Sequence, residues 1–285
     1  MKAKKILLIG SKGMAGHVIY HYLKEHTNFT VVDIARDSNF FEPSYNLDIT
    51  QLDQLKVILT NEAPDIVINC IGILNKNAEE NPDTAILFNS YFPHFISRTG
   101  KELGFKLIHI STDCVFNGKK GGYTVNDFKD GIGFYAQSKA LGEVTYGGNL
   151  TIRTSIIGPE LKDTGIGLFH WFMKQEGKIS GYTNAFWTGV TTIELAKAVV
   201  AAIEQGAQGL QHLVYGEKIS KYDLIDLFRV VFKRNNLEIE KFNDYYVDKS
   251  LIKNDSDFNY NVPPYKVMIE EMGKWILDHR YLYNY

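Results

Sequence analysis

The chain has 285 residues, with 31 Lys and Arg against 33 Asp and Glu, which leaves a formal net charge of −2. This near-balance argues against a nucleic-acid-binding protein, because phosphate contacts need a concentrated positive surface. The 45% apolar and 22% charged residues are typical of an ordinary globular protein with about two domains or one large domain.

Cysteine usage and the length of the apolar runs favour a soluble protein of the cytoplasm. Cys70 and Cys114 are too few for a disulfide scaffold, and no zinc-binding spacing is present. The apolar run 6–9 ends at Gly10, far short of a signal peptide, and the run 66–74 is too short to cross a membrane. We therefore expect no metal, no membrane partner and no nucleic-acid partner.

Short apolar strands alternate with helical patterns through the first half of the chain. Runs such as 66–68 are apolar on both faces, as in parallel sheets that helices cover on both sides. The alternation predicts an α/β fold with a doubly wound parallel sheet. Strands are expected at 4–9, 29–34, 65–69 and 105–110, with a further segment at 45–48, and helices at 14–25, 51–61 and 84–103.

The regular alternation of strand and helix patterns becomes less clear after Arg153. Residues 154–188 are rich in Gly and aromatic side chains, and helical spacing returns at 192–204. We predict a first domain at 1–155, to which a helix at 190–205 returns, and a smaller α/β domain formed mainly by 156–285. The last part of the chain is expected to contain a helix at 221–233, polar loops and a terminal helix after Pro263 and Pro264.

Three glycines, Gly10, Gly13 and Gly16, form a G-x-x-G-x-x-G loop between the first strand and the first helix. Glycine permits the tight turn, the approach of a pyrophosphate and close helix-on-strand packing, while the helix amino terminus offers free N–H groups. Asp33 follows about 20 residues after Gly13, where an acid meets the adenosine ribose. The loop therefore predicts a dinucleotide site, with Ser11, Met14 and Ala15 as further cofactor contacts.

Asp33 and Arg36 indicate different cofactors. An acid near the end of the second strand favours the ribose diol of NAD, whereas an arginine shortly after it can bind the 2′-phosphate of NADP. The cofactor is therefore expected to be NAD(P)H, with its preference open.

A second constellation combines Tyr135 and Lys139 with the Ser111-Thr112-Asp113 segment at the end of the fourth strand. Residues at i and i+4 share one helix face, and an ammonium lowers the pKa of a nearby tyrosine. The pair therefore predicts acid–base chemistry rather than an ordinary helix surface.

These residues resemble the extended short-chain dehydrogenase/reductases with a Rossmann-type sheet, and more closely their dTDP-4-dehydrorhamnose reductase-like branch. The resemblance implies NAD(P)H-dependent reduction of the 4-keto group of a nucleotide-diphospho-6-deoxysugar, by a homodimer paired through the helices at 84–103 and 135–146. It is carried by the glycine loop, 48–50, 64–69, Asn89, 111–116, the Tyr135 and Lys139 pair, and 152–155.

The resemblance also implies individual roles. Thr112 would bind the substrate carbonyl, Tyr135 would donate the proton, and Lys139 would hold the nicotinamide ribose and lower the pKa of Tyr135. Asp113 and Cys114 would contact the substrate. Further cofactor contacts would be Asp48, Ile49, Cys70, Ile71, Gly72 and Asn89.

One position departs from the branch, because Cys114 stands where a tyrosine is usual, and the glutamate of the related 4,6-dehydratases is also missing. Cys114 therefore suggests an epimerase or epimerase-reductase, with His170 as its partner, although a small buried cysteine is the simpler interpretation. A third alternative is a non-catalytic NAD(P)-binding subunit, resembling the regulatory subunit of methionine adenosyltransferase.

For several other side chains, the sequence allows either a functional or a purely structural role. Trp187, with Tyr182 and Phe186, suits either a stacked substrate or ordinary core. Arg153 suits either a phosphate or a structural salt bridge. His17 and His21 share one helix face but have no third ligand, so a metal pair is not expected.

Overall fold

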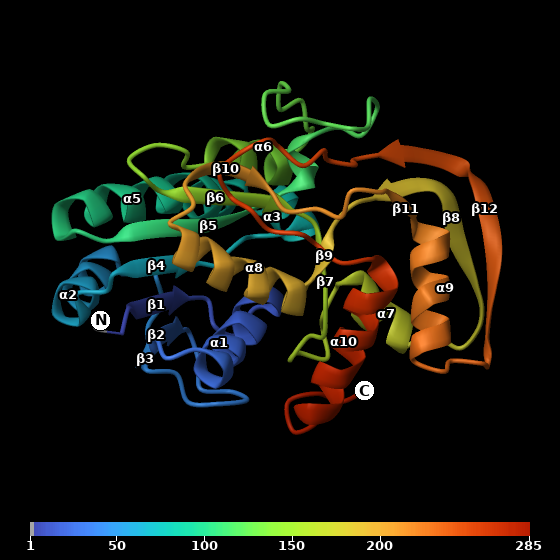
Figure 1. Ribbon diagram of the computed structural model, residues 1–285, viewed down its shortest axis with the longest axis horizontal. Helices are drawn as coiled ribbons and strands as arrows, with labels where there is room; N and C mark the ends of the chain where they lie inside the picture. The colour runs from blue at the N-terminus through green and yellow to red at the C-terminus, as the bar shows by residue number, and fades with distance from the viewer. Residues whose placement is uncertain (1–2) are drawn as a thin grey trace.

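The computed structural model describes residues 3–285. Its centre is a seven-stranded sheet in the order β10-β6-β5-β4-β1-β2-β3, and every neighbouring pair is parallel (Figure 1). This confirms the predicted α/β fold with a doubly wound parallel sheet. The strands are β1 (Lys5–Ile9), β2 (Thr30–Ala35), β3 (Tyr45–Asn46), β4 (Ile66–Asn69), β5 (Lys106–Thr112), β6 (Leu150–Thr154) and β10 (Gly209–His212).

Successive side chains of each strand enter opposite helix layers, as a doubly covered sheet requires. In β1, Ile6 and Leu8 pack on one side, with α1 and α8, while Leu7 and Ile9 pack on the other side, with α2 and α5. Burying one such aliphatic side chain stabilises the fold by roughly 1.5–3 kcal/mol. These helices are α1 (Met14–His26), α2 (Leu52–Glu62), α5 (Phe92–Leu103) and α8 (Thr192–Gln205), and α6 (Phe134–Leu141) lies near α5 (Figure 1).

A smaller sheet with the order β11-β8-β12 lies beside α9 at the other end of the molecule (Figure 1). It confirms a second, smaller mixed sheet. The prediction of polar loops is wrong for residues 237–248, which form the strand β12. This strand lies at the sheet edge with both faces mostly exposed, so it has no apolar alternation to detect. The elements are β8 (Gly177–Trp187), β11 (Ile219–Ser220), α9 (Lys221–Val231) and β12 (Leu237–Asp248).

The chain position of the domain boundary stays a prediction. Beyond residue 155, α8 packs against α1, and β10 extends the central sheet next to β6. The remaining elements include the short strands β7 (Ile156–Ile157) and β9 (Val190–Thr191) and the helices α7 (Leu168–Met173) and α10 (Tyr265–Asp278).

The region between β4 and β5 is more irregular than a single helix at 84–103. A short polar helix that the pattern did not predict, α3 (Asn75–Glu80), is followed by α4 (Pro82–Ala85) and a π-helical segment, Ile86–Tyr91, that leads into α5. A π-helical turn inside a helix often accompanies a functional site. Here it contains the buried Asn89.

The homodimer also stays a prediction. The two helical regions expected to pair carry exposed apolar side chains, among them Ile86, Tyr91, Leu141 and Tyr146. Across residues 3–285, no helix is long and apolar enough to cross a membrane, and no cluster of His, Cys, Asp and Glu has the arrangement of a metal site.

Candidate active site

A cavity of about 310 Å³ lies at the carboxyl ends of the central strands. The chain order reverses between β1 and β4, and such a switch point is where open α/β sheets bind their ligands. The cavity brings together residues that are distant in sequence. Its lining includes Gly13, Met14, Ala15, Cys70, Ile71, Gly72, Thr112, Asp113, Cys114, Tyr135 and Lys139.

The glycine loop has the geometry that a dinucleotide needs. Gly10 has φ +90°, a conformation that L-residues with side chains rarely adopt, and a Cβ on Gly16 would lie 2.0 Å from the Gly10 carbonyl oxygen. The Ser11 hydroxyl is buried and has no hydrogen-bond partner in the described part of the chain. An orphaned hydroxyl beside a free helix amino terminus fits the phosphates of a bound dinucleotide.

His17 ties this loop to a segment near residue 283 rather than to a metal. Its Nδ1 bonds the Gly13 carbonyl at 2.8 Å, and its Nε2 bonds the Tyr283 hydroxyl at 2.9 Å. The Trp275 indole N–H donates to the same hydroxyl at 3.0 Å. All donors and acceptors are satisfied when neutral His17 carries its proton on Nδ1.

This arrangement predicts acid sensitivity of the fold. Burial lowers the pKa of His17, His21 and His212 to about 4 each. Because unfolded histidines titrate near 6.5, the unfolded state binds more protons between these values, so stability is present above pH 6.5 and is lost as the pH falls toward 4. The free energy of unfolding in urea is expected to fall between pH 7 and pH 5, by roughly 2 kcal/mol from His17 alone.

A His17→Gln variant separates this effect from other titrations. Whatever the absolute stability of this variant, its free energy of unfolding should fall less steeply between pH 7 and pH 5 than that of the wild type. His26→Gln, at an exposed position, should keep the wild-type slope. Equal slopes in all three proteins would refute the role of His17.

The residues expected to contact the adenosine part of the cofactor lie outside the cavity lining. Asp33 is 0% exposed, lies before the end of β2, and accepts hydrogen bonds from the Ser44 N–H at 2.9 Å and hydroxyl at 2.8 Å. Arg36 is exposed, and its charge lowers the pKa of Asp48, although hydrogen bonds from Thr50 lower it more. Ile49 packs in the core. Among residues 3–285, the cavity lining contains none of Asp33, Arg36, Asp48 and Ile49.

The three predicted catalytic residues meet in the cavity. Thr112 ends β5, where its hydroxyl accepts the Cys114 N–H at 3.1 Å, and Tyr135 and Lys139 lie one turn apart on α6. Burial raises the pKa of Tyr135, and the charges of Cys114 and Asp113 raise it further, whereas a hydrogen bond with Thr112 lowers it. The phenol is therefore held protonated. Lys139 is not among the groups that lower the pKa of Tyr135 here, contrary to the expectation from the sequence.

The side chain of Lys139 contacts β5. Its Nζ donates to the Ile110 carbonyl oxygen at 2.7 Å and lies 3.4 Å from His109 Nε2. Burial lowers the pKa of Lys139 to about 8.

Asn89 braces the site without lining the cavity. Its side-chain oxygen accepts the Ile73 N–H at 2.8 Å, and its amide donates to the Ile73 carbonyl at 2.9 Å and to the Ser138 hydroxyl at 3.0 Å. It therefore joins the loop after β4 to α6.

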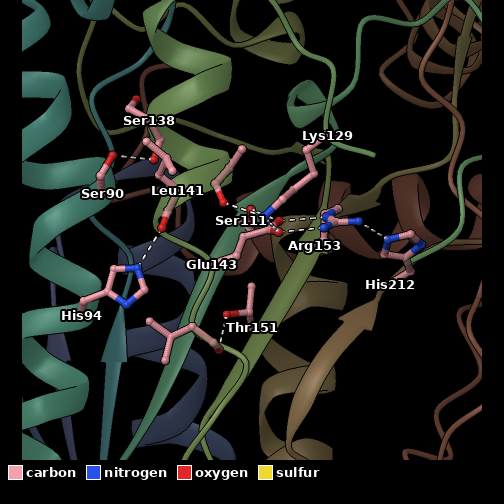
Figure 2. A network of polar contacts seen from close by, with 12 residues as sticks. Ser90, His94, Ser111, Lys129, Ser138, Leu141, Glu143, Thr151, Arg153 and His212 are labelled. Carbon is pink, nitrogen blue, oxygen red and sulfur yellow. Dashed lines mark hydrogen bonds and ion pairs between the residues drawn. The ribbon is translucent and has the colours of Figure 1, made fainter. Parts of the chain in front are cut away.

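Arg153 forms a buried salt bridge beneath the site, which decides between its two interpretations. Its Nε and Nη2 donate to both oxygens of Glu143, at 2.8 and 2.6 Å, and Nη1 donates to His212 (Figure 2). Glu143 also accepts the Ser111 hydroxyl at 2.7 Å. Burial favours the neutral acid, but the hydrogen bonds and charge of Arg153 outweigh it and hold the pKa of Glu143 below its ordinary value. The network braces β5, β6 and the end of α6.

Comparison with known proteins decides the family. The RmlD substrate binding domain family matches residues 4–244. The chain belongs to this family. Its members include NAD(P)-dependent sugar-nucleotide reductases.

The chain spans about half the length of the first curated relatives it matches. The probable low-salt glycan biosynthesis reductase of Haloferax volcanii is 30% identical over 137 residues, 47% of this chain and 46% of that protein. The dTDP-4-dehydrorhamnose reductase of Mycobacterium tuberculosis is 29% identical over 157 residues, 51% of each chain.

A solved structure shows that the fold is shared over the whole length. It is the dTDP-4-dehydrorhamnose reductase of Bacillus anthracis in complex with NADP, with a TM-score of 0.79. At 18% identity it covers 96% of this chain and 100% of that one.

Within this family fold, the structure does not bring Cys114 and His170 into one cavity. Burial raises the pKa of the Cys114 thiol to about 11. Both nitrogens of His170 are engaged, Nδ1 by the Tyr285 hydroxyl at 2.6 Å and Nε2 by the Asp163 carbonyl oxygen at 3.2 Å. Trp187 is buried in the core beside Tyr265, so it does not reach the cavity either.

The sequence pattern missed several residues that shape the site. Glu79 on α3 accepts the Tyr135 backbone N–H at 3.2 Å and so positions the start of α6. Lys221 and Lys249, from the smaller sheet region, place positive charge near Asp113, whose pKa burial nevertheless raises. The lysines carried no local signal, because single surface-type charges are common in any sequence.

A second cavity, of about 550 Å³, adjoins the first through Ile166, which lines both. It contains the side chains of His170, Trp171, Lys174 and Lys221, and its lining in the described structure includes no carboxylate. The second cavity therefore places lysine and aromatic side chains next to the first cavity.

Proposed function

We propose that this RmlD-family chain is an NAD(P)H-dependent reductase of the 4-keto group of a nucleotide-diphospho-6-deoxysugar. The observation that carries the proposal is the meeting of Thr112, Tyr135 and Lys139 with the glycine loop in one cavity. The loop and the orphaned Ser11 hydroxyl fit a dinucleotide, and bound NAD(P)H would supply the hydride.

The protein's own residues would orient the ketone and deliver the proton. The Thr112 hydroxyl, already held at the end of β5, would donate a hydrogen bond to the ketone oxygen. Tyr135 would give its phenolic proton to that oxygen as it becomes an alkoxide. The raised pKa of Tyr135 keeps this proton in place beforehand. Lys139 would return a proton to the site.

The adjoining cavity supports a nucleotide-diphosphate substrate. Lys174 and Lys221 suit a diphosphate, and the half-exposed Trp171 offers a flat face for a base or a sugar. The small net charge of the chain is compatible with such local cationic groups.

Two alternatives have less support. An epimerase using Cys114 and His170 needs a thiolate and a shared cavity, whereas the pKa of Cys114 is raised and His170 is engaged elsewhere. A non-catalytic NAD(P)-binding subunit has no need of the Tyr135 and Lys139 pair.

A reductase assay against dTDP-, UDP- and GDP-4-keto-6-deoxysugars, with NADH and NADPH, tests the proposal. We expect oxidation of a reduced cofactor with at least one substrate and a 4-hydroxy sugar as the product. Running the reaction in deuterium oxide tests the first alternative, because solvent deuterium at C3 or C5 would reveal epimerisation. Cofactor binding without turnover of any keto-sugar would favour the binding subunit.

A further inference from the structure

A chain of buried polar side chains lies beneath α6 and ends at Lys139. Asn69 and His109 are paired neighbours in β4 and β5, and both are fully buried. Asn69 Nδ2 lies 3.2 Å from His109 Nδ1, and His109 Nε2 lies 3.4 Å from Lys139 Nζ. The proposed reduction assigns no role to Asn69 or His109.

The direction of this chain is set at its first link. The backbone N–H of Ile71 can only donate, and it bonds Asn69 Oδ1 at 3.0 Å. The amide nitrogen of Asn69 must therefore donate to His109 Nδ1. Burial lowers the pKa of His109 well below its ordinary value, so the ring is neutral and has one donor and one acceptor. Its single proton is then on Nε2, facing Lys139.

The last link requires an acceptor. An ammonium has three donors and no acceptor, whereas a neutral amine has a lone pair. With a charged Lys139, the His109 N–H and the ammonium would face each other as two donors. Moving the His109 proton to Nδ1 transfers the conflict to Asn69, and turning the Asn69 amide transfers it to the Ile71 N–H. Only the neutral amine satisfies every link, while one of its own hydrogens stays on the Ile110 carbonyl oxygen.

We propose that Asn69 and His109 are positioning residues that fix the direction of this hydrogen-bond chain and thereby make the neutral amine the preferred form of Lys139 in the free protein. Lys139 then acts as a group that takes up and returns a proton, not only as a fixed positive charge. This consequence for catalysis rests on the proposed function, whereas the direction of the chain does not.

Burial and the surrounding charges act on Lys139 in opposite directions. Burial is the larger influence and lowers the pKa of Lys139 to about 8, whereas Glu143 and Cys70 favour the ammonium. At pH 7 burial alone therefore leaves the ammonium predominant, and the direction of the hydrogen-bond chain has to supply the further shift. His109 faces Lys139 from β5 and is influenced also by His94 on α5. Leaving a buried donor unpaired is unfavourable, so the hydrogen-bond pattern lowers the pKa of Lys139 beyond the effect of burial.

Nitrogen-15 NMR of histidine-labelled protein, without cofactor at pH 7, tests the direction of the chain. The proton of His109 is expected on Nε2, with Nδ1 unprotonated. His109→Leu assigns the signal. Observation of the Nδ1–H tautomer in the wild type would overturn the proposal.

Asn69→Asp tests the consequence for Lys139. A carboxylate accepts from both Ile71 and His109, so the tautomer should reverse and Nε2 should accept from the ammonium of Lys139. The pKa of Lys139, followed by the carbon-13 signal of its ε-carbon, is expected to rise by about one unit or more.

The added negative charge is controlled by placing Asn69→Asp in the His109→Leu background, where the charge remains but the chain is broken. The rise should be clearly smaller there, and equal rises in both backgrounds would overturn the proposal. If Asn69→Asp does not fold, the wild-type tautomer still decides. Neither measurement needs turnover, so a failure of the proposed reduction would show separately, as inactivity on every keto-sugar.

Discussion

Replacing Tyr135 with Phe is expected to lower kcat for reduction of the keto-sugar by a factor of about 10²–10⁴. The variant keeps the ring, which packs at the cavity beside Thr112, but has no proton to give to the developing alkoxide. Steady-state assays on the substrate identified by the panel measure the loss. The dissociation constant for NAD(P)H, measured by fluorescence titration, should change little because the glycine loop is untouched.

Tyr281→Phe is a matched control, because Tyr281 is exposed and is not among the residues that line the cavity. It should leave kcat unchanged. An unchanged kcat in Tyr135→Phe would remove Tyr135 from the mechanism, and a parallel loss of cofactor binding would indicate a collapsed site rather than a missing proton.

Replacing Glu143 with Leu is expected to lower the free energy of unfolding by roughly 3–5 kcal/mol. Arg153 is only 1% exposed, so the variant leaves a buried guanidinium without its carboxylate partner. The Ser111 hydroxyl loses its acceptor in the same change. Urea unfolding followed by circular dichroism measures the loss, and activity should fall too, because Ser111 directly precedes Thr112.

Two comparisons make this prediction specific. The double variant Glu143→Leu with Arg153→Met should recover most of the lost stability, because apolar replacement of a buried pair is often close to neutral. Glu102→Gln, which removes an exposed ion pair with Lys56, should change stability little. A single variant as stable as the wild type would show that the network does not hold the fold.

The glycine loop and the Tyr135 and Lys139 pair could be placed from the sequence because their geometric requirements are local, whereas their roles in binding and catalysis stay predictions. A tight turn between a strand and a helix needs glycine at fixed spacing, and two side chains on one helix face need an interval of four. The alternation of strands and helices in the first half could also be predicted from local sequence patterns. The structure confirms the parallel sheet that this alternation predicts.

The cofactor contact of Asp33 stays a prediction. Asp33 stands at the interval expected for a ribose-binding acid, but β2 continues to Ala35. One carboxylate oxygen accepts from Ser44, and the other is buried without a hydrogen-bond partner among the described residues. Whether an acid reaches a ligand depends on where the strand ends and on which loop folds over it. The number of residues between Gly13 and Asp33 determines neither the end of the strand nor the position of that loop.

The sequence by itself determined the class of fold, the glycine loop between β1 and α1 and the placement of Tyr135 and Lys139 on one helix face, since each depends on neighbours within about one helix or strand. Only the tertiary structure decided the pairing of Arg153 with Glu143, the strand β12 and the chain from Asn69 through His109 to Lys139. These features depend on strand register and on packing between distant segments, and a buried hydrogen bond has a direction only when all its neighbours are in place.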